Sequence, residues 1–415
     1  MPRLRRVALS IALLMPTLAA AAPWQGRTEM LDGVQQVQNP AAPADAEQEL
    51  VLDELWRAGD DEEAEDFFGV ISDAVVDAAG DVYLLDSQLV EVKRYSADGE
   101  FLGTIGREGE GPGEFRFPTA LFLMDDGRLG VLQGRPARVV LFHTDGTPAG
   151  DLVLPTPEDG GFRFVQRADA RGNTLALQGM EFRRGDTGGE RTQRLVLMPA
   201  DGQGETKELL SHSTQFDFAK PERSELDEYL QWVLLPGGRV AAAETFDYRL
   251  RLWGADGALE RVVTVDYPDL ARSGDELAAV KERLQGGMRF RGRRNMDIQV
   301  QVEPREPGVR WMDVDAAGRL WVLSGRGSKA QDATHLGAFD VFDASGRLLH
   351  RLRLAGDGDI DADRFVLAGD RLLVLKEFDS AMRAMRGGDG EDAEEDLEDA
   401  VPMSVICYRL PALDS

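Results

Sequence analysis

The chain repeats a short pattern of apolar runs bounded by glycine turns. Six times a Gly precedes a compact apolar run, as Gly80 precedes Val82-Tyr83-Leu84-Leu85. Five times an aromatic residue or Met stands three positions before a polar-Gly pair, as Tyr95 stands before Asp98-Gly99. Short apolar runs between such turns are typical of β-strands, and Asp-Gly pairs accept the positive φ values that tight hairpins need. Each unit therefore predicts four antiparallel strands.

The spacing of the glycines supports a regular repeat. In three units the two turn glycines are 19 positions apart, namely Gly80 and Gly99, Gly127 and Gly146, and Gly238 and Gly257. Repeated four-stranded sheets arranged around an axis protect the sheet edges that would otherwise pair with other chains. The sequence therefore predicts an all-β fold, a six-bladed β-propeller over residues 49–412.

The ends of the repeat array indicate how the ring closes. The sixth unit supplies only three strand-like segments, around Phe365, Leu373 and Ile406. An isolated strand-like run, Glu49 to Trp56, precedes the first unit. We expect this N-terminal strand to complete the last blade.

A longer motif carries a family resemblance. The segment from Gly106 to Phe115, GREGEGPGEF, is followed by Pro118, a strand, a Gly turn and an Arg-centred strand. It resembles the NHL-repeat type of six-bladed β-propeller found in exported bacterial proteins, over residues 49–412. The position that usually holds Arg in this family holds Glu91 in unit one, Ala338 in unit five and Ser404 in unit six. The resemblance implies the fold and leaves the activity open, because such propellers include binding scaffolds and unrelated enzymes.

The N-terminus has the order of a secretory signal. Three arginines, the first of them Arg3, precede an apolar run from Val7 to Leu14 and then small residues from Ala19 to Ala22. We expect a signal peptide over residues 1–21 with cleavage near Ala21, and a periplasmic or secreted protein without a transmembrane segment after cleavage. Both the general secretory and the twin-arginine routes stay open. Residues 22–48 lack apolar periodicity, which predicts a flexible leader.

Composition excludes several partners and cofactors. The formal net charge is −27, from 47 Lys and Arg against 74 Asp and Glu, and it repels phosphate backbones, so we expect no nucleic-acid partner. The single Cys excludes an intramolecular disulfide and Cys-ligated metal clusters. The alternating acids from Asp357 to Asp363 lack the Gly and Glu of an EF-hand, with Ala362 and Ala368 in their places. We expect a monomer with no cofactor, and weak calcium binding stays open.

The longest insertions are predicted to lie on one face of the ring. The Gly turns of a blade lie on one face of the ring, and the other connections lie on the opposite face. In this chain the long connections are all of the second kind: Gly179 to Thr192, His212 to Glu228, Pro268 to Gly308, Ser324 to Gly337, and Asp379 to Pro402. Long loops on a rigid scaffold often carry binding or catalytic residues. The alternative is that this face tolerates insertions that have no function. Within residues 268–308 we expect a short helix beginning at Ser273, followed by an Arg-rich segment. Residues 384–401 are predicted to form a disordered acidic insertion.

Aligning the units gives the candidate ligand-binding residues. Second strands end at Asp86, Gln133 and Glu244, and third strands begin at Arg138, Arg194 and Arg249, so these side chains face one another across the loops. They form either rim salt bridges, such as Glu244 with Arg249, or a ring of arginines that recognises carboxylates. The insertions add Arg291, Arg293 and His335. Arg291 and Arg293 would contact an anion or acidic partner, or the protein's own carboxylates.

These features favour a binding scaffold over an enzyme. The chain shows no nucleophile elbow, no Ser-His-Asp pattern and no Lys-Ser/Thr phosphate loop, so no catalytic residue is assigned. We expect an exported propeller that binds a protein, peptide or small ligand through the face with the long loops, without catalysis. The alternative is a propeller lyase or hydrolase with an optional divalent cation.

Overall fold

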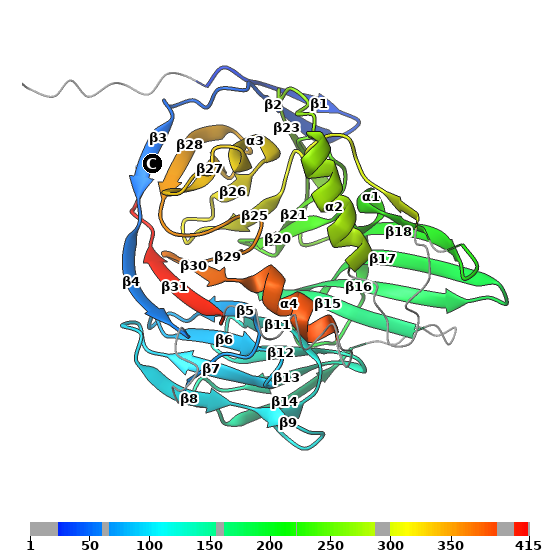
Figure 1. Ribbon diagram of the computed structural model, residues 1–415, viewed down its shortest axis with the longest axis vertical. Helices are drawn as coiled ribbons and strands as arrows, with labels where there is room; N and C mark the ends of the chain where they lie inside the picture. Colours follow the sequence, from blue (N-terminus) through cyan, green and yellow to red (C-terminus); the bar gives the residue numbers. More distant parts are fainter. Residues whose placement is uncertain are drawn as a thin grey trace, which may run out of the picture.

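The computed structural model contains six antiparallel sheets around a common axis (Figure 1). It describes residues 24–59, 66–154, 162–220, 222–286, 299–387 and 402–413. Each sheet is one blade, and its first strand lies innermost. The chain is therefore a six-bladed β-propeller, as the repeat predicted.

Blades 1 to 3 follow one another along the chain. Blade 1 contains β5 (Ile71–Val76), β6 (Val82–Asp86), β7 (Glu91–Tyr95) and β8 (Phe101–Ile105). A short parallel pair, β9 (Arg107–Glu108) and β10 (Glu114–Phe115), leads to blade 2. Blade 2 contains β11 (Pro118–Leu123), β12 (Leu129–Gly134), β13 (Ala137–Phe142) and β14 (Pro148–Val153). Blade 3 contains β15 (Phe162–Arg171), β16 (Thr174–Arg184), β17 (Gly188–Pro199) and β18 (Lys207–Asp217).

Blades 4 to 6 complete the ring. Blade 4 contains β20 (Gln231–Leu235), β21 (Arg239–Ala243), β22 (Arg249–Trp253) and β23 (Leu259–Val265). Blade 5 contains β25 (Trp311–Val314), β26 (Leu320–Leu323), β27 (His335–Phe342) and β28 (Leu348–Ala355). Blade 6 contains β29 (Arg364–Ala368), β30 (Arg371–Lys376), β31 (Ser404–Arg409) and β4 (Asp53–Ala58).

The N-terminal strand closes the ring, as predicted. β4 pairs antiparallel with β31, so strands from the two ends of the chain share blade 6. Trp56 on β4 stacks on Tyr95 of blade 1, with the ring centroids 5.6 Å apart. The preceding strand, β3 (Gln48–Val51), runs parallel to β28 as a fifth strand of blade 5. The predicted single strand is thus two strands that tie blades 5 and 6 together.

The prediction of a flexible leader over residues 22–48 is wrong for its central part. β1 (Arg27–Leu31) and β2 (Val34–Asn39) form a hairpin, and β2 runs parallel to β23 at the outer edge of blade 4. The carboxamide of Asn39 is buried between two blades. Its Nδ2 donates to Thr264 O and Gly346 O, and its Oδ1 accepts from Leu348 N. These backbone partners belong to other parts of the chain, so local apolar periodicity did not reveal the hairpin.

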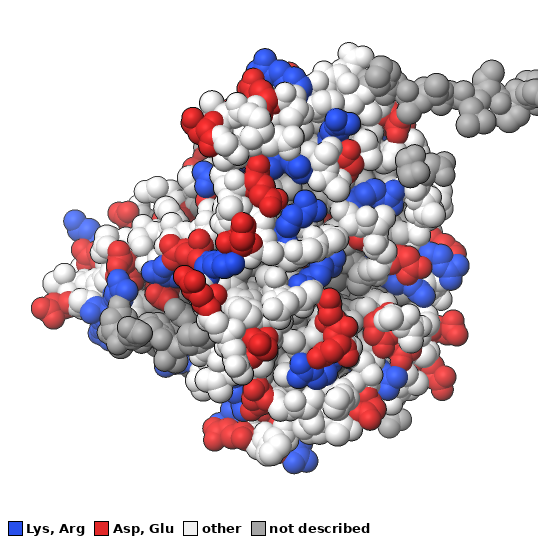
Figure 2. Space-filling model, turned by 180° about the vertical axis from the view of Figure 1, so that it is seen from behind, with Lys and Arg blue, Asp and Glu red and all other residues white. Residues whose placement is uncertain are grey.

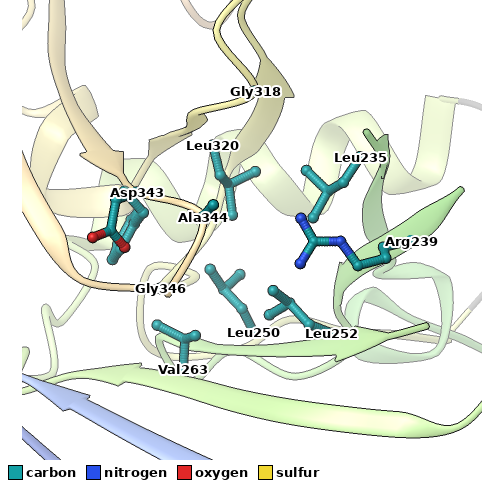
Figure 3. A pocket seen from close by; sticks show the side chains of 11 residues that line it. Leu235, Arg239, Leu250, Leu252, Val263, Gly318, Leu320, Asp343, Ala344 and Gly346 are labelled. Atoms are coloured by element: carbon teal, nitrogen blue, oxygen red, sulfur yellow. The ribbon is translucent and has the colours of Figure 1, made fainter. Parts of the chain in front are cut away.

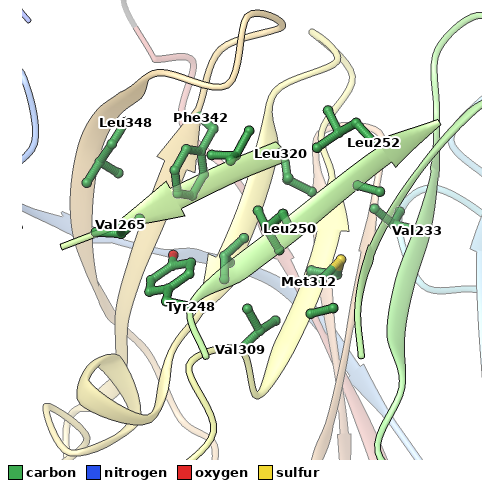
Figure 4. Packing of buried hydrophobic residues seen from close by; sticks show 14 of the residues in the cluster. Val233, Tyr248, Leu250, Leu252, Val265, Val309, Met312, Leu320, Phe342 and Leu348 are labelled. Atoms are coloured by element: carbon green, nitrogen blue, oxygen red, sulfur yellow. The ribbon is translucent and has the colours of Figure 1, made fainter. Parts of the chain in front are cut away.

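Apolar packing between neighbouring blades forms the core. Between blades 4 and 5, Leu250 and Leu252 of β22 pack with Leu320 and Phe342 of blade 5 (Figure 4). At the Gly-turn end of this interface the remaining hollow, beside Arg239, is about 10 Å³ (Figure 3). That volume holds one water molecule at most. The interface is therefore closed to ligands at this end.

The insertions form additional structure. α2 (Gly274–Gly286) begins directly after Ser273, and Ser273 and Glu276 exchange the reciprocal hydrogen bonds of a capping box. α2 and α4 (Phe378–Gly387) both lie in front of the ring in Figure 1. In blade 3 the predicted loop from Gly179 to Thr192 is a hairpin extension of β16 and β17, which projects to the right in Figure 1.

Several predicted features lie outside the described residues. These are the signal peptide, the Arg-rich segment with Arg291 and Arg293, and residues 388–401 of the acidic insertion. Within the described ranges, no helix is long and apolar enough to cross a membrane. On the face behind α2 and α4, Lys and Arg side chains alternate with Asp and Glu (Figure 2).

Candidate functional site

The predicted rim residues of blade 2 hold the blade together. Gln133 and Arg138 are opposite each other in the ladder. Gln133 is buried, and its Oε1 accepts a hydrogen bond from Arg116 N at 3.0 Å. Arg138 Nη2 donates to Glu114 O at 2.8 Å, and its Nη1 lies 3.1 Å from Asp151 Oδ2. Both side chains are thus engaged within the protein.

Two further candidates are also engaged internally. Asp86 is buried, and its carboxylate accepts hydrogen bonds from the backbone N–H groups of Gly69, Val70, Gln88 and Leu89. It fixes the loop between β6 and β7. Arg194 pairs with Glu181 at 3.3 Å and with Glu208. The structure therefore gives these residues intramolecular partners in blades 1 and 3.

The predicted pair of Glu244 with Arg249 is not formed. Glu244 Oε1 accepts from Arg251 Nη1 at 2.6 Å instead. The ladder between β21 and β22 ends at Ala242 and Arg251, and beyond it Glu244 no longer faces Arg249 in a regular ladder. Arg249 is exposed, and within the described ranges its guanidinium has neither an ion pair nor a hydrogen bond.

His335 lies at the start of β27, beside β3. Its Nδ1 is 2.8 Å from Asp332 Oδ1, and its Nε2 is 3.5 Å from Glu49 Oε2. The imidazole lowers the pKa of Asp332, together with hydrogen bonds from Thr334. This histidine therefore joins blade 5 to the N-terminal segment.

Arg249 lines a hollow of about 260 Å³ beside blade 4. The hollow lies between the start of β22, the end of β23 and the connection that leads to β25. Its walls include aromatic, acidic and basic side chains, among them Phe246, Tyr248, Arg249, Tyr267, Asp269 and Glu306. The hydroxyl of Tyr267 is buried near Ser324 and the backbone of Arg326, but among the described residues nothing forms a hydrogen bond of normal geometry with it.

The floor of the hollow is fixed by a buried polar chain. Tyr248 Oη donates to Asp340 Oδ2 at 2.9 Å, and Arg351 Nε donates to Asp340 Oδ1 at 2.7 Å. Burial raises the pKa of Tyr248, and the neighbouring Asp340 charge raises it further. Burial also raises the pKa of Asp340, although Arg351 opposes the shift. A satisfied buried network of this kind restricts the conformations of its members.

Two connections form a cap beside the hollow. β19 (Glu222–Ser224), which precedes α1 (Glu225–Glu228), pairs in parallel with β24 (Gln299–Gln301) after α2. Arg272 Nη1 lies 2.7 Å from Glu225 Oε2. Glu276 of α2 pairs with Lys329, which follows α3 (Gly325–Ser328). Segments far apart in sequence thus meet on the face with the long loops, and no local pattern indicated their contact.

The innermost strands place charged residues inside the ring. Arg167 of blade 3 is held electrostatically by Asp73 of blade 1 and Asp313 of blade 5, and repelled by Arg364 of blade 6. A residue of blade 3 reaches those blades only across the axis. Loop patterns in the sequence did not indicate this group; the signal was a charged residue within each of several apolar inner strands.

Some of these channel residues satisfy the free edges of neighbouring inner strands. Asp73 Oδ2 accepts from Leu121 N of blade 2 at 3.0 Å, and Asp313 Oδ2 accepts from Leu367 N of blade 6 at 2.9 Å. Arg364 Nη1 donates to Ser72 O of blade 1 at 2.6 Å. These contacts join blades around the axis, where the backbone edge would otherwise be exposed.

Asp169 destabilises the folded protein to a degree that depends on pH. Burial raises the pKa of Asp169 to about 6, against the opposing charges of Arg171 and Arg167. Because the folded pKa lies above the unfolded value, stability falls as the pH rises from about 4 to about 6 and levels off above that. We expect Asp169→Asn to raise Tm at pH 8 by about 1–3 °C, since partial exposure limits the gain to about 1 kcal/mol. At pH 4 thermal unfolding should show no gain; an equal gain at both values would contradict this account.

Comparisons with known proteins found similar solved structures and assign no activity to this chain. No protein-family profile matches the chain. No curated protein matches it in sequence. A member of the DUF4221 family from Bacteroides vulgatus shares 12% identity over 87% of this chain and 98% of its own, with a TM-score of 0.47. The chain is a six-bladed β-propeller.

Two other solved structures are similar to this propeller. An exported protein from Bacteroides fragilis has 12% identity over 91% of this chain and 100% of its own, with a TM-score of 0.45. Regucalcin, a calcium-binding protein from Agrobacterium tumefaciens, has 15% identity over 90% of this chain and 97% of its own, with a TM-score of 0.40. At these identities the likeness concerns the fold alone.

Metal-ligating side chains are dispersed in the described part of the propeller. No three His, Cys, Asp or Glu residues converge there in a way that would hold a metal ion. Cys407, the single cysteine, is buried in β31, and burial raises its pKa to about 11. The absence of a cofactor stays a prediction.

Proposed function

We propose that this protein is an exported, non-catalytic propeller that binds a ligand at the hollow beside blade 4. One observation carries the proposal: the guanidinium of Arg249, which has no ion pair or hydrogen bond among the described residues, lines a hollow of about 260 Å³ together with the aromatic residues Phe246, Tyr248 and Tyr267. Ligand sites are commonly concave surfaces in which a few polar groups fix the orientation of a mostly apolar ligand. The cap formed by α1, α2 and the β19–β24 pair adds a contact surface next to it.

The chemistry of the hollow suits a carboxylate attached to an apolar or aromatic group. Arg249 supplies a forked donor for the carboxylate, and the rings of Phe246 and Tyr248 supply apolar surface. Arg305 contacts both acids at the rim and offsets one of their two charges, with Nη2 lying 2.8 Å from Asp247 and Nη1 lying 2.7 Å from Asp269. Within the described ranges, Arg249 is a cation at this site that has no intramolecular ion pair or hydrogen bond. A small organic acid or the C-terminus of a peptide fits this description.

The test is direct binding by the mature protein. We expect aromatic and aliphatic carboxylic acids and short peptides with free C-termini to raise Tm, and Arg249→Ala to weaken the binding of the best of them about tenfold or more, because a charge-assisted hydrogen bond is lost. Titration calorimetry gives the ratio of the two dissociation constants. Arg239→Ala is the matched control, since Arg239 lies at the opposite, Gly-turn end of blade 4. Equal binding by wild type and Arg249→Ala would exclude this site.

The alternative, a lyase or hydrolase, rests on a different observation. Burial raises the pKa values of Asp169 and Asp313 to about 6 in both cases, which suits proton transfer near neutral pH. Incubation of the bound ligand with protein, with and without divalent cations, distinguishes the two functions. Recovery of unchanged ligand supports binding alone, whereas a product whose formation requires Asp169 or Asp313 supports the enzyme.

A further inference from the structure

We propose that the ligand of the hollow beside blade 4 is a free α-amino acid with an aromatic or branched apolar side chain. The inference rests on the proposed function, because it specifies the ligand of that same site. It follows from the carboxylates around Arg249, which outnumber the cations that hold them. A simple carboxylic acid supplies a partner for Arg249 alone, whereas an α-amino acid also carries a positive ammonium group.

The lining of the hollow is richer in acids than in bases. It includes the carboxylates of Asp247, Asp269 and Glu306, together with the guanidinium of Arg249. Glu306 is buried, and its Oε1 has two cationic nitrogens at 3.5 Å and 3.6 Å. Both of those cations also pair with a glutamate of α1 or α2. They therefore have no charge to spare for the two aspartates.

The two aspartates share a single cation, Arg305. Its Nη2 lies 2.8 Å from Asp247 Oδ1, and its Nη1 lies 2.7 Å from Asp269 Oδ1. Among the described residues, the Oδ2 atom of each aspartate has neither a hydrogen bond nor an ion pair. Both side chains are mostly exposed, so a ligand can reach them. An ammonium group brings one positive charge and three N–H donors, which is what this pair of carboxylates lacks.

Asp247 and Arg249 lie on one tight turn at the start of β22. Arg249 N donates to Asp247 O at 2.8 Å, which closes a turn of three residues. Tyr248 between them is buried, whereas both charged side chains are exposed. No ion pair joins the two within the described ranges. The ammonium and the carboxylate of an α-amino acid are attached to the same carbon atom, so one small ligand can contact both side chains.

The size and the apolar walls of the hollow favour a single amino acid over a peptide. The volume of about 260 Å³ lies below the range of about 300–1,000 Å³ that is common for sites of drug-sized ligands. Phe246, Tyr267 and Leu270 supply apolar surface for one side chain. In a dipeptide the ammonium and the carboxylate belong to different residues, so they are farther apart than Asp247 and Arg249 require.

Ligand pairs that differ only in the ammonium group test the proposal on the mature protein. L-Phenylalanine is compared with 3-phenylpropionate, and L-leucine with 4-methylpentanoate, by titration calorimetry. We expect the better amino acid to bind about tenfold or more tightly than its partner without the ammonium group, because a charge-assisted hydrogen bond is added. The dipeptide Ala-Phe should bind more weakly than phenylalanine.

Variants assign the two charges of the ligand to separate residues. Asp247→Asn should weaken binding of the amino acid about fivefold or more and leave binding of the plain carboxylate unchanged or stronger. Arg249→Ala should weaken both ligands. Glu260→Gln is the matched control, because Glu260 is an exposed acid at the Gly-turn end of β23. If Asp247→Asn does not fold, Asp269→Asn takes its place, and the wild-type comparison needs no variant.

The outcomes separate this inference from the function on which it rests. Equal affinity for the amino acids and the plain carboxylates, both weakened by Arg249→Ala, would overturn the amino-acid proposal and leave the carboxylate site intact. Ala-Phe binding as tightly as phenylalanine would exclude a free amino acid as the preferred ligand. Binding that Arg249→Ala does not weaken, or no binding of any probe, would reject both proposals.

Discussion

Deletion of residues 49–58 is expected to abolish cooperative folding of the whole ring. The deletion removes all of β4 and most of β3, so β31 loses its antiparallel partner and blade 5 loses its fifth strand. Trp56, 8% exposed, also leaves its stack on Tyr95 at the seam between blades 6 and 1. An open ring exposes the edge of β31 and the apolar faces of two blades. Thermal unfolding followed by circular dichroism should show no sharp transition.

Two variants separate ring closure from a general effect of shortening the chain. Deletion of residues 22–43 removes the β1–β2 hairpin but leaves every strand of the six blades, so a cooperative transition at lower temperature is expected. Trp56→Ala keeps the strand and removes its buried ring, which should cost about 3–5 kcal/mol. A wild-type Tm after deletion of residues 49–58 would show that closure by β4 does not stabilise the ring.

The second large effect is expected from Arg351→Met. The carboxylate of Asp340 is 1% exposed and takes its counter-charge from Arg351 at 2.7 Å. Removal of one partner of a buried ion pair leaves an uncompensated charge, which typically costs about 3–5 kcal/mol. Chemical denaturation at pH 7 measures the loss. Because protonation removes the charge of Asp340, the variant should regain part of its stability as the pH falls below neutral.

The controls for this prediction lie in the same network. Tyr248→Phe removes one hydrogen bond to Asp340 and keeps the ion pair, so a loss of about 1 kcal/mol is expected. The double variant Arg351→Met with Asp340→Leu removes both charges and should be more stable than Arg351→Met alone. A double variant as unstable as the single one would show that packing, and not the unpaired charge, causes the loss.

The repeat and its exceptions show which features local sequence reveals. The glycine turns and apolar runs predicted the blades, and the Ser273 to Glu276 spacing predicted where α2 begins, because these signals depend on neighbouring residues. The partner of Glu244 was predicted incorrectly, since the ladder ends two residues before it and Arg251 becomes the nearer cation. Of the predicted ring of arginines, Arg138 and Arg194 have internal partners and Arg249 lines a hollow.

The sequence by itself determined the strand order, the number of blades and the closure by the N-terminal strand, because hydrophobic alternation and turn chemistry repeat within each unit. Only the tertiary structure decided where Asn39 is buried, which arginines are paired, and that Asp73, Arg167, Asp313 and Arg364 meet around one axis. Those contacts join residues that are tens to hundreds of positions apart, from up to four different blades. Their positions follow from the curvature of the closed ring, which no single repeat contains.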